Sequence, residues 1–360
     1  MVGENLQNKN RFVHLDLLRI IAIFFVIYNH TGSYGYMLFA SCISSPVSVF
    51  YLIISILCKI AVPLFFCVSG ALLLKKDETL KQLFLKRIFR MIIVLVIVSV
   101  PYYYWLHRDN GTGILDFFRW IYTNSASSSL WYLYSYIALL LMLPFLRSMV
   151  KNMKQQEFVY LFIGHVFFVG VLPCLEYLLI NKTNMIHDSF TPIIFITQSV
   201  FFVLMGYFFE HVYDITTLKK KHLFFCILSS VLAILFTCFI TYYQTTIEVC
   251  TPHQLERFFN CFICIPAFTI FILIKRLGIT IKKKYLGHWI SIAGSAVFGV
   301  YLIEKISRAL LTKVYDILHP FIGSFFASLV WCFAVLVFSL IIIIILKRTP
   351  IIKKLVNKFI

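Results

Sequence analysis

The sequence predicts an all-α integral membrane protein: a polytopic bundle of about ten transmembrane helices that forms a single domain over residues 1–360, with both termini cytoplasmic. Composition is the first reason. Of the 360 residues, 61% are hydrophobic and 13% are charged, whereas a soluble domain averages about 45–50% apolar and about 25% charged. Lipid is the solvent that accepts so much apolar surface. The second reason is that basic residues gather on alternate connections between the apolar segments.

The predicted helices are the apolar runs. A membrane-spanning helix needs about 20 mostly apolar residues, and ten runs approach this length. One of them, 289–312, also carries Glu304, Lys305 and Arg308. In chain order the predicted helices are 13–32, 47–74, 88–106, 130–149, 158–180, 190–210, 223–243, 257–275, 289–312 and 322–346.

The basic residues predict the orientation. Of the 33 Lys and Arg residues, 24 lie before the first helix, on alternate connections or after the last helix. The other connections carry few, and the one at 33–46 carries none. Lys and Arg are enriched on the cytoplasmic side, so both termini are expected there. This pattern also explains the net charge of +18 without nucleic-acid binding, because no basic stripe coincides with a soluble module.

The ten cysteines lie mostly inside apolar segments, where free Cys behaves as a small hydrophobe. Cys261 and Cys264 form a CxxC motif within the predicted helix 257–275, and no second pair accompanies them. A zinc site needs four ligands, so we predict no metal site and no bound cofactor.

Ionisable residues inside spanning helices are costly and are therefore candidates for function. In the first helix, Asp16 and Arg19 are three residues apart and can pair on one face. The alternative is a helix start whose Arg extends towards the interface. His30 follows Arg19 by eleven residues, which is about 16 Å and about three turns. The two side chains therefore share a face and line one path, unless His30 is merely an interfacial residue.

Two further polar motifs have both a structural and a functional interpretation. Ser69 and Gly70 interrupt an apolar run, where small residues permit close helix packing. Arg87 and Arg90 lie on one face of the segment KRIFR. They either anchor the helix at the cytoplasmic surface or form a phosphate cradle, to which guanidinium groups are well suited.

Aromatic residues open the fourth helix: Trp131, Tyr132, Tyr134 and Tyr136. Trp and Tyr are enriched at membrane interfaces, so an aromatic belt explains them. The functional alternative is a platform on which a sugar stacks.

The ordered set of motifs resembles the acyltransferase-3 family of bacterial membrane proteins over the whole chain. The Arg-x10-His element is Arg19 to His30. A departure is Glu304, where the family often has His. The other matching segments are VPLFFCVSGALLL (62–74), KRIFR (86–90), SLWYLYSYIALLLMLP (129–144), FFVLMGYFF (201–209) and FGVYLIE (298–304).

The resemblance implies a multi-pass enzyme of the bacterial plasma membrane that transfers acyl groups other than amino-acyl groups. The expected activity is O-acetylation: acyl-CoA, by default acetyl-CoA, donates from the cytoplasm to a hydroxyl of a surface glycan. Capsule, exopolysaccharide or a lipid-linked precursor are the expected acceptors, and homo-oligomers are compatible with the family. The chain resembles the stand-alone type, without an extracytoplasmic hydrolase-like domain.

The resemblance also implies roles for individual residues. His30 is expected to act as general base for the acceptor hydroxyl or to carry the acyl group transiently. The catalytic candidates are His30 and Glu304, and the substrate-binding candidates are Asp16, Arg19, Ser69, Arg87, Arg90, Trp131, Tyr134 and Tyr301.

The same polar residues are compatible with a different class of protein. A transporter or exporter of a glycan or a small polar solute also places Arg, His and Glu inside its bundle. A lipid-linked glycosyltransferase is less consistent with the sequence, because there is no acidic metal-binding pair of the DxD kind.

Overall fold

The computed structural model describes residues 12–106, 113–124, 127–183, 185–280 and 284–349. Within these ranges all regular secondary structure is helical. Each of the ten predicted segments contains a helix. The long helices are α1 (Val13–Asn29), α3 (Val47–Cys58), α4 (Ala61–Leu73), α6 (Phe89–Leu106), α8 (Trp131–Asn152), α9 (Gln155–His165), α10 (Leu172–Ile180), α12 (Gln198–Tyr207), α13 (Lys220–Ile247), α14 (Cys264–Thr280), α15 (Lys284–Leu310) and α16 (Thr312–Arg348).

Shorter elements connect or extend these helices. Four are α-helices: α2 (Leu38–Ser41), α5 (Leu80–Leu83), α7 (Ile114–Thr123) and α11 (Ile193–Ile196). Five are 3₁₀ turns: η1 (Gly32–Tyr34), η3 (Ser128–Leu130), η5 (Asp188–Phe190), η7 (Ile215–Thr217) and η8 (Gln254–Glu256). Three are π-helical: η2 (Phe84–Ile88), η4 (Val166–Val171) and η6 (Phe208–Val212).

Six helical stretches in the described ranges are long and apolar enough to cross a membrane. They are Val47–Leu73, Trp131–Asn152, Gln155–Ile180, Lys220–Ile247, Tyr285–Leu310 and Thr312–Arg348. The chain is therefore an all-α protein of membrane-protein character, as predicted. The count of ten spans and the cytoplasmic location of both termini stay predictions.

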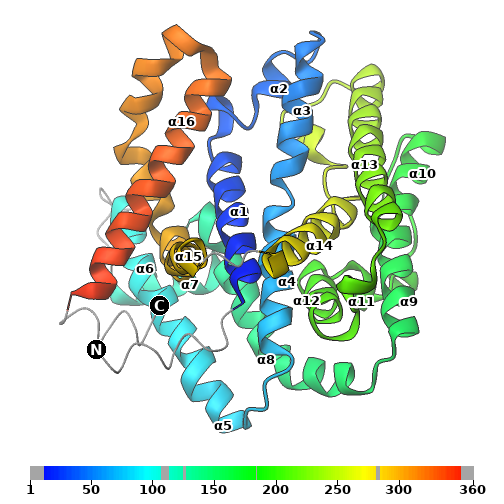
Figure 1. Cartoon of the computed structure of the whole chain (residues 1–360). Helices are drawn as coiled ribbons and strands as arrows, with labels where there is room; N and C mark the ends of the chain where they lie inside the picture. Colours follow the sequence, from blue (N-terminus) through cyan, green and yellow to red (C-terminus); the bar gives the residue numbers. More distant parts are fainter. Residues whose placement is uncertain (1–11, 107–112, 125–126, 184, 281–283, 350–360) are drawn as a thin grey trace.

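Helix α1 lies at the centre of the bundle. It packs between α15 and α16 on one side and α4 and α14 on the other (Figure 1). Its apolar residues Leu18, Ala22, Ile23 and Ile27 are fully buried. Because α1 is surrounded by other helices, the polar side chains that it carries contact protein.

The closest helix packing joins α4 to α12 at two glycines. A Cβ atom added to Gly70 would lie 1.9 Å from the carbonyl oxygen of Val203, and one added to Gly206 would lie 2.0 Å from that of Cys67. Any side chain at either position would collide with the facing backbone. The close-packing interpretation of Gly70 is therefore correct.

The structure differs from the predicted helix boundaries in several places. The predicted helix 47–74 is divided into α3 and α4, and the predicted helix 190–210 is divided into α11 and α12. The segment 257–275 is not helical throughout, because α14 begins only at Cys264 and turns precede it. Pro266 lies in the first turn of α14, where its missing N–H is harmless. The CxxC motif thus lies at a helix start, not inside a helix.

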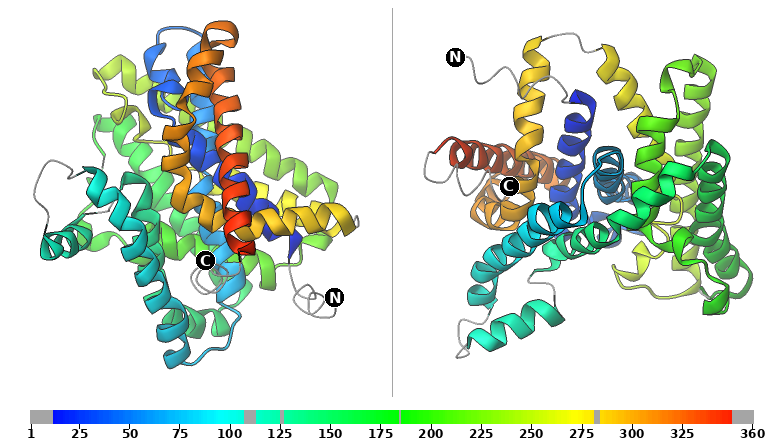
Figure 2. Two further views of the ribbon diagram at one scale, coloured as in Figure 1. Left: turned by 90° about the vertical axis from the view of Figure 1, so that its left-hand side faces the viewer. Right: turned by 90° about the horizontal axis from the view of Figure 1, so that it is seen from below.

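In α16, Gly323 has φ 75° and ψ 165°, which breaks the helix in two. Finally, α7 was not expected; it packs beside α6 at the edge of the bundle (Figure 2).

Candidate functional site

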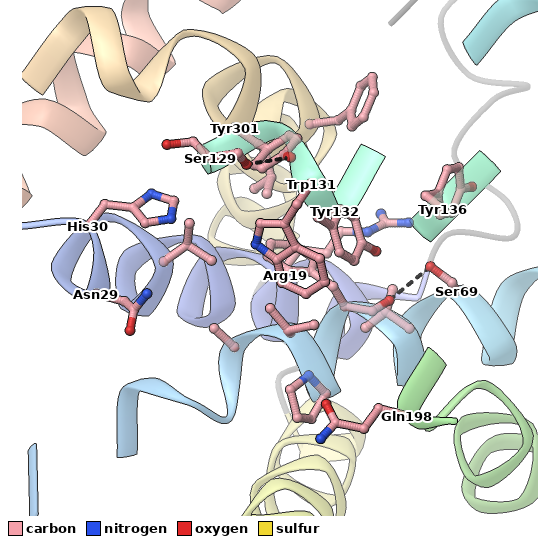
Figure 3. A pocket seen from close by; sticks show the side chains of 18 of the residues that line it. Arg19, Asn29, His30, Ser69, Ser129, Trp131, Tyr132, Tyr136, Gln198 and Tyr301 are labelled. Carbon is pink, nitrogen blue, oxygen red and sulfur yellow. Dashed lines mark hydrogen bonds between the residues drawn. The ribbon is translucent and has the colours of Figure 1, made fainter. Parts of the chain in front are cut away.

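A cavity of about 510 Å³ opens beside α1. This volume is within the range of about 300–1,000 Å³ that is usual for small-molecule sites. Its walls come from α1, the junction of α3 and α4, η2 with α6, the start of α8, and α15. Figure 3 shows His30 and Asn29 at one side of the cavity and Tyr136 and Ser69 at the other. We call these two sides the histidine end and the arginine end.

The arginine end is formed by Arg19, Arg87 and Arg90, all of which line the cavity. All three lie close enough to Tyr136 to interact with it electrostatically. Arg19 donates to Oδ1 of Asp16 at 2.9 Å, as their spacing predicted. Nε of Arg90 is buried and has no hydrogen-bond partner. This end therefore presents guanidinium groups to the cavity, and one of them has an unused donor.

Glu78, outside the predicted spans, holds one of these arginines in place. Its carboxylate accepts from Nε of Arg87 at 2.8 Å and from Arg147 at 2.9 Å. Arg147 also donates to the carbonyl of Leu73 at 3.0 Å. The hydrogen bonds from Arg87 lower the pKa of Glu78 to about 2, so it is ionised at neutral pH. Glu78 and Asp16 supply two carboxylates, and the guanidinium groups beside them number four: Arg19, Arg87, Arg90 and Arg147. The arginine end therefore keeps a positive excess.

The histidine end is built on the residue that follows α1. His30 caps the helix, and its Nδ1 lies 2.9 Å from Oε1 of Glu304 on α15. Glu304 is fully buried, and Nε of Arg308 donates to its Oε2 at 2.8 Å. Arg308 also donates to the backbone carbonyl of His30. A carboxylate paired with a guanidinium only accepts, so Nδ1 of His30 carries the proton that it donates to Glu304. In the neutral form of such an imidazole, Nε2 is the nitrogen that accepts.

Aromatic and hydroxyl side chains form the wall between the two ends. Tyr301 donates its hydroxyl to the carbonyl of Ser129 at 2.7 Å. Trp131 is 45% exposed and lines the cavity beside Tyr132, whose ring stacks on Tyr136. Stacked rings with few charges between them suit a long neutral chain or the apolar face of a sugar.

The predicted site residues fall into three groups. Those that line the cavity are Arg19, His30, Ser69, Arg87, Arg90, Trp131 and Tyr301. Asp16 and Glu304 lie behind Arg19 and His30 and hold them. Tyr134 does not line the cavity: its hydroxyl donates to the carbonyls of Ile121 and Asn124, so it fastens the end of α7. The substrate-binding role predicted for Tyr134 therefore has no geometric support here.

The lining residues that the sequence interpretation missed include Asn29, Lys59 and Asn260. Lys59 had a visible signal, because it is a charge in the middle of the apolar run 47–74. Asn29 adjoins His30 in the chain. Asn260 gave no signal, since it precedes α14 in a turn that the pattern did not reveal.

The described residues contain no group of three or more His, Cys, Asp or Glu side chains able to hold a metal ion.

Comparison with known proteins gives one match. The family model of the acyltransferase-3 family, described as an acyltransferase domain, matches residues 12–348. A search of curated proteins and a search of solved structures found no match. The match spans nearly the whole chain, and the apolar helices agree with a membrane location. The chain belongs to the acyltransferase-3 family and is a membrane acyltransferase.

Proposed function

We propose that the protein transfers an acyl group, by default acetyl, from acyl-CoA to a hydroxyl of a surface polysaccharide or its lipid-linked precursor. The observation that carries the proposal is that one cavity holds both an arginine end and a histidine end. The two ends are set by Arg19 and His30, about three helical turns apart on α1. A donor held at one end can reach a base at the other.

The arginine end suits the donor. Coenzyme A carries several phosphate charges on its nucleotide half, and its thioester is at the end of a long flexible arm. Arg90 has an unused Nε donor, and Arg19 and Arg87 each have guanidinium nitrogens beyond those that donate to Asp16 and Glu78. Guanidinium donors of this kind bind phosphate oxygens well. The arm then extends along the wall formed by Tyr132 and Trp131 towards His30.

The histidine end suits proton transfer. Nε2 of His30 accepts the proton of the acceptor hydroxyl as the oxygen attacks the thioester carbonyl. The C–S bond breaks, and the thiolate of coenzyme A takes the proton from the imidazolium. Glu304 fixes the tautomer and stabilises the imidazolium, and Arg308 holds Glu304 in position. Glu304 is therefore a positioning residue, not one that contacts substrate.

A second route passes through His30 covalently. In that route Nε2 attacks the thioester, the C–S bond breaks, and coenzyme A leaves as the thiolate. The acyl-imidazolium then transfers its acyl group to the hydroxyl oxygen, and the hydroxyl proton passes to the thiolate. Labelled acyl that is trapped on wild-type protein in the absence of acceptor, and is lost in His30→Ala, selects the covalent route. Label found only on the acceptor selects the general-base route.

The proposal is tested with purified protein in liposomes that contain labelled acetyl-CoA and a glycan acceptor. Label on the glycan, dependent on His30, is the expected result. Movement of the glycan across the bilayer without labelling would instead identify a transporter and contradict the proposal.

A further inference from the structure

Lys59 is a charge that the acyl-transfer chemistry does not use. It follows α3 at the junction with α4 and lines the cavity. Its ammonium contacts Oε2 of Glu256 at 2.6 Å and lies 5.0 Å from the centre of the Tyr36 ring. The backbone N–H of Tyr36 donates to Thr31, the residue after His30, so Lys59 belongs to the histidine end. Both members of the Lys59–Glu256 pair are about four-fifths buried, and a lysine buried to this extent is costly unless it is paired.

The segment that carries Glu256 is firmly held. Leu255, Phe258 and Phe259 are buried in the core. Arg257 donates to Glu248 at 2.8 Å, which ties the segment to the end of α13. The Glu256 carboxylate therefore lies on a well-packed segment. A polar group that is held in a fixed position can discriminate between ligands.

Two amides also line the cavity. Asn29 adjoins His30 at the histidine end (Figure 3), and its side-chain amide has both donor and acceptor groups. Asn260 lines the cavity as well and is exposed. This end therefore offers both donors and acceptors, the pattern that matches hydroxyl groups.

The charge balance differs between the two ends. Among the described lining residues of the histidine end, Lys59 is the one Lys, Arg, Asp or Glu, and Glu256 neutralises it. The arginine end, by contrast, keeps its positive excess. An anionic ligand is therefore favoured at the arginine end and gains no net charge attraction from Lys59.

We propose that the histidine end is an acceptor subsite for an uncharged, hydroxyl-rich unit such as a neutral hexose. Lys59 donates to a hydroxyl, the side-chain amide of Asn29 forms a hydrogen bond with another, and Glu256 disfavours anionic sugars by cancelling the charge of Lys59. This inference rests on the acyl-transfer function proposed above and names the class of its acceptor.

The test compares two acceptors of one shape and different charge: methyl glucuronamide, which is neutral, and methyl glucuronate, which is anionic. Full-length protein in liposomes receives labelled acetyl-CoA and each acceptor, and kcat/KM gives a neutral-to-anionic ratio. Glu256→Gln leaves Lys59 uncompensated and should lower the ratio roughly 10-fold. Lys59→Met leaves Glu256 uncompensated and should raise it. The double variant restores neutrality and should return to the wild-type ratio.

Lys275→Met is the matched control, because Lys275 pairs with Glu210 at 3.3 Å and does not line the cavity. Its ratio should equal that of the wild type. A wild type that prefers the anionic acceptor, or variants that all keep one ratio, would overturn the inference while leaving acyl transfer intact. Absence of label on both acceptors with the wild type would contradict the proposed function itself, and this inference with it.

Discussion

Replacing Glu304 by Gln is the most informative single perturbation of the cavity. Glu304 is fully buried and accepts from His30 at 2.9 Å and from Arg308 at 2.8 Å. The side chain of Gln has nearly the same shape, but it has one acceptor oxygen in place of two. Arg308 is always charged and only donates, so it competes with His30 for that oxygen.

The expected consequence is a change of tautomer. If the amide oxygen faces Arg308, the NH₂ group faces His30, and Nδ1 of His30 must accept instead of donate. The proton then moves to Nε2, which can no longer take a hydroxyl proton. A wrong tautomer costs a catalytic triad about 10,000-fold in kcat, so we expect kcat to fall about 100- to 10,000-fold. Stability should fall by about 1.5–3 kcal/mol, the value of one charge-assisted hydrogen bond.

The assay is the initial rate of label transfer from acetyl-CoA to glycan, with thermal unfolding of the same samples as a control for folding. The matched variant is Glu304→Gln combined with Arg308→Gln, which removes the competing donor. This pair should recover part of the lost kcat, because the amide oxygen of the substituted side chain can then turn to His30. A single variant with the wild-type kcat, or a double variant slower than the single one, would refute the positioning role.

Other changes test the remaining parts of the account. Arg90→Ala should raise the KM for acyl-CoA about 10- to 100-fold with little effect on acceptor KM, since a hydrogen bond to phosphate is lost; an unchanged acyl-CoA dependence would make Arg90 a membrane anchor. Gly206→Val should prevent stable folding, because its Cβ would lie 2.0 Å from the carbonyl of Cys67; a variant with the wild-type melting temperature contradicts the close α4–α12 contact. Reporter fusions at Lys220 should read cytoplasmic and those at Thr123 external, and a reversed result at either would break the predicted topology.

Features that depend on local periodicity could be predicted from the sequence. Arg19 and His30 share a helix face because eleven residues are close to three turns, and both line the cavity. Arg87 and Arg90, three residues apart, were likewise predicted to share a face, and both line the cavity. Each apolar run also contains helix, since length and hydropathy are properties of the run itself.

Features that depend on contacts between distant parts of the chain could not be predicted from the sequence. Glu304 contacts His30 across 274 positions, and nothing local specifies that pairing. Glu78, in a connection, holds Arg87 and Arg147 together only after the helices have packed. Lys59 was visible as a charge within the apolar run 47–74, but the break between α3 and α4, at which it lines the cavity, was not.

The central claim is that His30 handles the hydroxyl proton of the acceptor, and His30→Ala tests it most directly. The measurement is the rate of label transfer from acetyl-CoA to glycan in liposomes, using variant protein shown by its melting temperature and detergent-solubilised size to be folded. Loss of a general base lowers a rate about 100- to 10,000-fold, and loss of a nucleophile lowers it further. We expect a loss of at least that size with the KM for acyl-CoA little changed, since the arginine end is intact. Transfer by His30→Ala at close to the wild-type rate would contradict the mechanism.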